Sequence, residues 1–207
     1  MGSIRYRMEV RKRGQPRLTP DDWAIAAFRA IARGGIDAVA VEPIAAELGA
    51  TKGSFYWHFK NRDALIEAAL DEWERRLTEE VIDELERDPD PANRLQQLFG
   101  AAFQQGPTGR AAEIAILANP EHPAVLRRVR RVAQRRITYI AKQLEQLGWE
   151  GSDALDRAVL LSYLYVGFLQ LSHVLPHMVS DAVRRRHAEL VFDTLVAAEL
   201  PTRSVVR

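Results

Sequence analysis

Apolar residues recur at spacings of three and four along most of this chain, which is the period of an amphipathic helix. The clearest run lies in residues 61–87, where the apolar positions are Leu65, Ile66, Ala69, Leu70, Trp73, Leu77, Val81, Ile82 and Leu85. No stretch of strict alternation rich in β-branched residues competes with this pattern. The pattern therefore predicts an all-α fold.

Prolines, glycines and capping residues divide the pattern into about nine helices. Thr19 and Pro20 can start the first helix and Gly34-Gly35 can end it, while Asn61 can cap the longest one, which should run unbroken to about Arg87. The predicted helices cover residues 20–33, 42–48, 51–58, 61–87, 91–105, 108–118, 122–147, 152–175 and 180–198.

Composition narrows the class of protein. The chain has 207 residues, of which 47% are hydrophobic and 28% charged, as in an ordinary globular protein. It has no cysteine, which excludes a disulfide scaffold, a thiol nucleophile and thiolate metal sites. The most apolar stretch, 158–171, is shorter than the roughly 18 residues that a membrane span needs, so no membrane helix is expected.

Positive charge gathers at the N-terminus, although the net charge is only +1. Residues 1–60 hold ten Lys and Arg against six Asp and Glu, and the excess is densest before Leu18. Residues 1–17 are too polar to pack in a core, so we expect a basic arm there. It is either a solvated tail or an arm that contacts nucleic acid.

Two short predicted helices flank a turn at Gly49-Ala50, in the arrangement of a helix-turn-helix. The second of them exposes hydroxyl, aromatic and basic side chains that can reach base edges and phosphates. Phe59 is expected in the core, and Trp57 either there or on the surface. A helix hairpin of this kind can also be a packing unit without a nucleic-acid partner.

Residues 44–65, with the sequence IAAELGATKGSFYWHFKNRDAL, resemble the DNA-binding segment of the TetR family of bacterial transcriptional regulators. The resemblance implies that Thr51, Lys52 and Ser54 approach base edges beside Gly53. It implies that the DNA backbone is held by Tyr56, Trp57, His58, Lys60 and Arg62. Glu42-Pro43 departs from the family, in which a basic or polar residue often starts that helix.

The C-terminal half offers little for catalysis or metal binding. It has no nucleophile–base pair and no glycine-rich phosphate loop, so no enzyme activity and no cofactor are expected. His173 and His177 stand four residues apart, but Pro176 separates them and no metal site is expected. The arginines of 127–136 are expected to form the solvated face of a helix whose other face is apolar.

The resemblance further implies a cytoplasmic, nucleoid-associated homodimer that binds a palindromic DNA operator, pairs through the helices near 152–175 and 180–198, and has no membrane partner. An unknown small, largely apolar effector would release it.

The expected division of the chain into domains is an arm at 1–17, a DNA-binding domain at 18–64 and an effector-binding and dimerisation domain at 65–207. The expected cavity lining is Phe99, Phe103, Ile114, Leu117, Ile140, Tyr163 and Met178. The alternative is a helical enzyme or carrier whose helix-turn-helix only packs.

Overall fold

A computed structural model describes residues 18–197, and every regular element in that range is helical. The predicted basic arm at 1–17 lies outside the described residues. The all-α prediction is confirmed. When α4 and α5 are joined into one rod, residues 18–197 form nine α-helical rods. They are α1 Pro20–Gly34, α2 Val41–Glu47, α3 Lys52–Tyr56, α4 Arg62–Glu74 with α5 Glu80–Leu85, α6 Pro91–Phe103, α7 Pro107–Leu117, α8 Pro123–Gln146, α9 Gly151–Val174 and α10 Asp181–Phe192.

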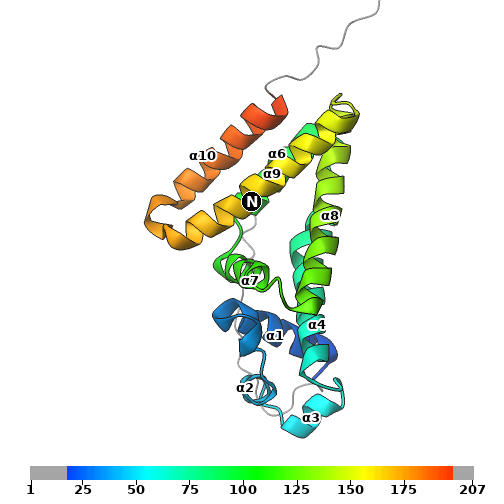
Figure 1. The fold of residues 1–207 in the computed structure, drawn as a ribbon, viewed down its shortest axis with the longest axis vertical. Coiled ribbons are helices and arrows are strands. Elements are labelled where there is room, and N and C mark those ends of the chain that lie inside the picture. The colour runs from blue at the N-terminus through cyan, green and yellow to red at the C-terminus, as the bar shows by residue number, and fades with distance from the viewer. Residues whose placement is uncertain (1–17, 198–207) are drawn as a thin grey trace, which may run out of the picture.

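Helices α1 to α3 form a small unit at one end of an elongated molecule (Figure 1). Thr19 and Asp22 cap the start of α1 reciprocally, as the sequence suggested for Thr19. Trp23, Phe28 and Ile31 are buried on the inner face of α1, against α4 and α7. This packing fixes α1 as the platform on which the two shorter helices stand.

One long helical rod leaves this unit and enters the other half of the molecule. It runs from α4 into α5, but the expected unbroken α-helix is wrong in one respect: Arg75–Glu79 form a π-helical turn between them. Such turns often occur at functional sites. This turn lies where the rod passes from the N-terminal unit to the C-terminal helices.

The C-terminal half is a bundle of α6 to α10. Helix α8 packs beside α4 and α9, and α10 packs against α6. Helices α9 and α10 both lie in the half of the molecule away from α3 (Figure 1). One apolar core joins α1 to α4 with α7 and the start of α8, and a second lies among α6, α8, α9 and α10. The first core contains residues from both sides of the domain boundary expected between 64 and 65. That boundary remains a prediction.

Candidate nucleic-acid interface and ligand cavity

The turn between α2 and α3 has the geometry that a helix-turn-helix requires. Gly49 has a φ of 63°, a left-handed conformation that glycine adopts without a side-chain clash. The amide of Ala50 donates to the carbonyl of Ala45 at 2.8 Å, closing the end of α2. Thr51 then caps α3, because its side-chain oxygen accepts from the amide of Ser54 at 3.1 Å.

Aromatic contacts hold α3 on the protein. Phe55 is fully buried, with its ring 5.5 Å from Trp23 and 5.6 Å from Phe59 between centroids. The prediction that Phe59 belongs to the core is confirmed. Trp57 is instead 81% exposed, so it does not anchor the rod that follows. Tryptophan is enriched at interfaces, so an indole this exposed favours a surface that meets a partner.

The opposite face of α3 and the loop after it is open to solvent. Of the predicted DNA contacts, Thr51, Lys52, Gly53, Tyr56, Trp57 and Lys60 are exposed, and Ser54 and His58 are half-buried. Figure 1 places α3 at the tip of the molecule, so no other described element covers this face. The structure thus brings these eight residues together on one accessible surface, which we call the α3 face.

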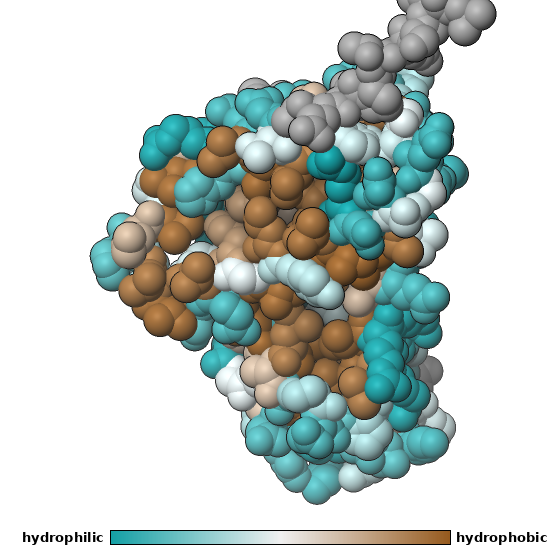
Figure 2. Space-filling model, turned by 45° about the horizontal axis from the view of Figure 1, so that its top comes forward, coloured by the Kyte–Doolittle hydropathy of each residue, from teal (hydrophilic) through white to brown (hydrophobic). Residues whose placement is uncertain are grey.

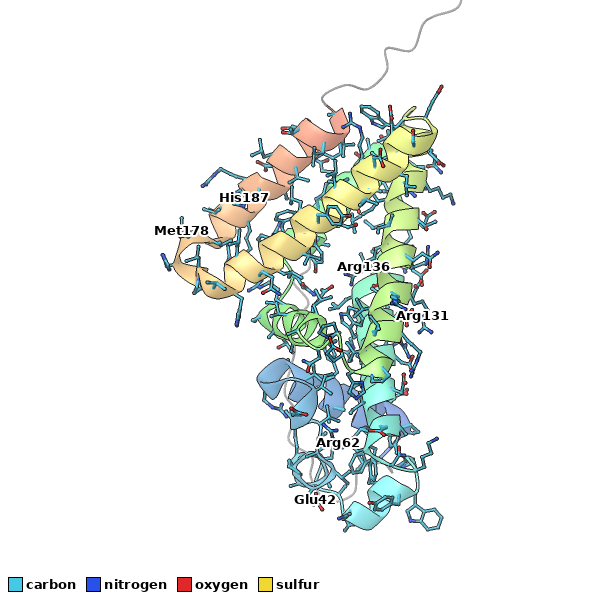
Figure 3. The ribbon with its side chains drawn as sticks, viewed as in Figure 1. Glu42, Arg62, Arg131, Arg136, Met178 and His187 are labelled. Carbon is cyan, nitrogen blue, oxygen red and sulfur yellow. The ribbon has the colours of Figure 1, made fainter. Side chains whose placement is uncertain are left out.

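Arg62 is placed differently from the other predicted contacts. Its Nε donates to the carbonyl of Val39 at 2.7 Å and its Nη2 donates to the carbonyl of Ile36 at 2.8 Å. Figure 3 shows Arg62 between α4 and the α1–α2 connection. Its guanidinium therefore ties the start of α4 to that connection, a role that the linear motif did not reveal.

Lys52 of the α3 face is paired with an acid from the preceding helix. Its Nζ lies 2.6 Å from Oε1 of Glu42, and both side chains are exposed. The hydrogen bond from Lys52 lowers the pKa of Glu42, and the same hydrogen bond raises the pKa of Lys52. Glu42 therefore competes with any anion that approaches this lysine.

We expect Glu42→Gln to tighten binding to double-stranded DNA by roughly 3- to 10-fold at low salt, because it frees Lys52 and removes a negative charge beside the α3 face. Fluorescence anisotropy with a labelled duplex measures this. Glu84→Gln is the matched control, since Glu84 is an exposed acid paired with Arg87 at the other end of the rod. Unchanged affinity in Glu42→Gln would argue against DNA contact by Lys52.

Four arginines of α8 form a ladder of ion pairs with the rod. The expectation of a solvated face is therefore only partly right: Arg127, Arg130 and Arg131 are exposed, but Arg128 is buried. Arg128 is 8% exposed and contacts Asp71 and Glu74, the latter at 2.7 Å. Arg131 contacts Glu74 through its Nε at 2.8 Å, and Arg131 is labelled on α8 in Figure 3. The other rungs are Arg127 with Glu67 and Arg135 with Glu79. The ladder fastens the rod to the C-terminal bundle.

A cavity of about 180 Å³ lies between the rod and helices α6 to α9. Four of the predicted lining residues are there: Phe99, Phe103, Leu117 and Ile140. Ile114, Tyr163 and Met178 do not line it, so that part of the prediction is wrong. Tyr163 is 67% exposed, and Figure 3 shows Met178 at the α9–α10 turn, away from Arg136. The side of α9 that faces the cavity carries Tyr165 and not Tyr163.

The wall of the cavity contains a buried polar group that the sequence analysis missed. Glu113, on α7, is 1% exposed and accepts from Arg136 at 2.5 Å and from the hydroxyl of Tyr165 at 2.7 Å. Arg136 also donates to the π turn, to Thr78 Oγ1 at 2.9 Å and to the Leu77 carbonyl at 3.0 Å. Arg136 therefore links the cavity wall to the rod.

Burial and the neighbouring groups shift the pKa values of Arg136 and Tyr165. Burial alone would lower the pKa of Arg136, but Glu113 and Tyr165 outweigh it and the pKa is raised. Burial and the charge of Glu113 raise the pKa of Tyr165 well above its ordinary value of 10.0. Arg136 is thus a guanidinium and Tyr165 a neutral phenol. Within residues 18–197 no cluster of three or more potential metal ligands occurs.

Comparisons with known proteins agree with this geometry. Residues 25–69 match the profile described as "Bacterial regulatory proteins, tetR family". An HTH-type transcriptional regulator from Saccharopolyspora erythraea is 33% identical over 70 residues, which are 34% of this chain and 30% of that protein. The chain thus matches less than a third of the length of that curated relative.

Solved structures share the fold over nearly the whole chain. A transcriptional regulator from Rhodococcus sp. Rha1 superposes with a TM-score of 0.76 at 19% identity, covering 87% of this chain and 97% of that one. A protein from Saccharomonospora viridis, described as a transcriptional regulator and solved in complex with choline, has a TM-score of 0.74 at 21% identity and covers 84% and 95%.

Proposed function

We propose that this chain is a cytoplasmic DNA-binding repressor of the TetR family of bacterial regulatory proteins, and that a small molecule releases it from a palindromic operator. The profile match over residues 25–69 and the shared fold support this proposal. The observation that carries the proposal is the α3 face, where hydroxyl, aromatic and basic side chains stand exposed on a helix held by buried aromatic residues. A helix presented in this way fits the major groove, with its side chains at base edges and the surrounding residues at phosphates.

Removing a lysine from the α3 face tests the proposal. We expect Lys60→Ala and Lys52→Ala to weaken binding to specific and random duplexes alike, and each to lower the slope of log K against log salt by about one, because each lysine neutralises about one phosphate. Lys142→Ala is the matched control, since Lys142 is an exposed lysine of α8. Equal slopes for all three variants and the parent would contradict docking by the α3 face.

Ser54→Ala should act differently, by changing which sequences are preferred. Ser54 lies on α3 beside Lys52 and carries no charge, so its loss removes a base-edge contact and leaves the phosphate contacts in place. Selection from a randomised duplex pool would show altered enrichment with a salt slope like that of the parent.

We infer that two copies pair through α9 and α10. Helix α9 is long and apolar enough to span a membrane by length and composition alone. In this protein one of its sides packs in the core, where Ala154, Ala158 and Leu169 are buried. Leu160, Leu164, Leu171 and Val174 are exposed on another side, and with Gly167 they recur at spacings of four and three. That is the spacing of a helix–helix seam, and Figure 2 shows the brown apolar side chains gathered on this face.

Pairing would give the α3 face its reading geometry. Two-fold related recognition helices must lie about 34–36 Å apart to enter successive major grooves, so a palindromic operator would match the symmetry of the dimer. A ligand would release the DNA if it bound more tightly to a dimer whose two recognition helices stand at a different separation. Arg136 is placed to carry that change, since it contacts both the cavity wall and the π turn of the rod.

The rival function is a helical enzyme or carrier that uses the same cavity. We favour a regulator because the ionisable pair in the cavity wall, Glu113 and Arg136, is engaged in its own hydrogen bonds and neither group is free to act as an acid or base. Absence of DNA binding, together with turnover or transport of a cavity ligand, would favour the rival.

A further inference from the structure

We propose that the cavity selects uncharged molecules of about the size of one aromatic ring, and that the ion pair of buried Glu113 with half-buried Arg136 is the group that excludes charged ones. The proposal rests on the proposed function, because it names the class of effector that the cavity of the regulator takes.

Size sets the first limit. The cavity measures about 180 Å³, and an apolar cavity of about 150 Å³ in another protein stays dry and binds benzene. Aromatic and aliphatic side chains make up most of the lining, among them Trp73, Phe99, Phe103, Ile140 and Leu161. Such a lining favours a flat apolar molecule, which gains free energy by leaving water and by dispersion contacts.

Charge sets the second limit. Both oxygens of the Glu113 carboxylate already accept hydrogen bonds, one from Arg136 and the other from Tyr165 and from Gln105 at 3.3 Å. Ser162, which also lines the cavity, donates to the Ala158 carbonyl at 2.9 Å. The pair carries no net charge. An anion or cation entering the cavity would therefore lose its hydration without gaining a free counterion, which weakens its binding.

Matched probes of equal shape separate the two limits. Nitrobenzene and benzoate have nearly the same shape but differ by one negative charge, and ethylbenzene and benzylammonium differ by one positive charge. At pH 7.5 and without DNA, we expect isothermal titration calorimetry to show each uncharged probe binding at least about 100-fold more tightly than its charged counterpart. In NMR spectra of the bound protein, signals of Phe99 and Ile140 should shift and those of Tyr163 should not.

A single substitution should reverse the preference. Glu113→Gln keeps the shape of the side chain and can still accept from Tyr165, but it leaves Arg136 as an unpaired cation in the cavity wall. We expect its affinity for benzoate to rise at least about tenfold, with its affinity for nitrobenzene changed by less than about threefold. Circular dichroism melting shows whether this variant folds.

Three results would overturn the inference: charged and uncharged probes binding equally to the parent, neither uncharged probe binding at millimolar concentration, or a folded Glu113→Gln protein that gains nothing for benzoate. The probe panel on the parent alone decides the matter if Glu113→Gln does not fold. Because these titrations contain no DNA, their failure leaves the DNA-binding proposal standing. A failed DNA-binding assay would equally leave the ligand selectivity intact.

Discussion

Replacing Arg128 by methionine is expected to lower the free energy of unfolding by about 3 kcal/mol, because it removes one of the two arginines that pair with the largely buried Glu74 while keeping most of the aliphatic stem. Arg128 is 8% exposed and lies between Asp71 and Glu74 of α4. Glu74 is itself 12% exposed and would keep only Arg131 as a partner. Urea unfolding at a fixed protein concentration measures the change.

The neighbouring arginine supplies the control. Arg127 is 67% exposed, and its partner Glu67 is half-exposed, so Arg127→Met should cost no more than about 1 kcal/mol. A similar loss in both variants would show that burial of the Arg128 ion pairs adds nothing to stability.

The same ion pairs predict the acid response. Burial would raise the pKa of Glu74, but hydrogen bonds from Arg131 and Arg128 outweigh it and lower the pKa below 4.5. A carboxylate whose pKa is lower in the folded state than in the unfolded state stabilises the protein at pH values above its unfolded-state pKa. This stabilisation is lost as the pH falls through the folded-state pKa of the carboxylate. The parent should therefore lose stability below about pH 4.5, and Arg128→Met should show a shallower loss.

An aspartate at Leu171 is expected to separate the two copies and with them to abolish operator binding. Leu171 is 59% exposed in one copy and lies in the proposed seam of α9, so Leu171→Asp would bury two unpaired carboxylates per dimer. The dimer dissociation constant should rise at least about 1000-fold. Sedimentation should then show a monomer, and operator affinity should fall more than about 100-fold because one recognition helix holds only one half-site.

Gln96→Asp, on an exposed position of α6, is the control for added charge and should leave mass and affinity unchanged. A Leu171→Asp protein that sediments as a dimer with normal melting would place the interface elsewhere. A monomer that still binds the operator with the affinity of the parent would contradict the need for two recognition helices.

Local signals explain why so much of the fold was predictable. Thr19 and Asn61 each accept from a backbone amide within the first turn of the helix they start, and Gly49 adopts the positive φ that its turn requires. Each of these features depends on residues close together in the chain. The order of elements, the buried Phe59 and the exposed α3 residues follow from the same kind of information.

The mispredicted features depend on contacts between distant segments. Arg62 reaches carbonyls 23 and 26 residues away, and the arginines of α8 meet acids of α4 more than 50 residues away. The sequence did contain a signal for these ion pairs, because acids at 67, 71 and 74 and arginines at 127, 128 and 131 form two stripes of opposite charge on the two helices. Choosing Tyr165 over Tyr163 required the rotation of α9 about its axis, which an almost uniformly apolar helix does not specify.

Paired α3 faces would read an inverted repeat in DNA. Selection from a pool of randomised duplexes, with the full chain as a dimer and salt raised between rounds, tests this. We expect enrichment of two inverted half-sites whose centres are about one helical turn apart, with affinity that falls steeply as salt increases. A pool in which no inverted repeat is enriched, from a chain shown to be a folded dimer, would contradict it.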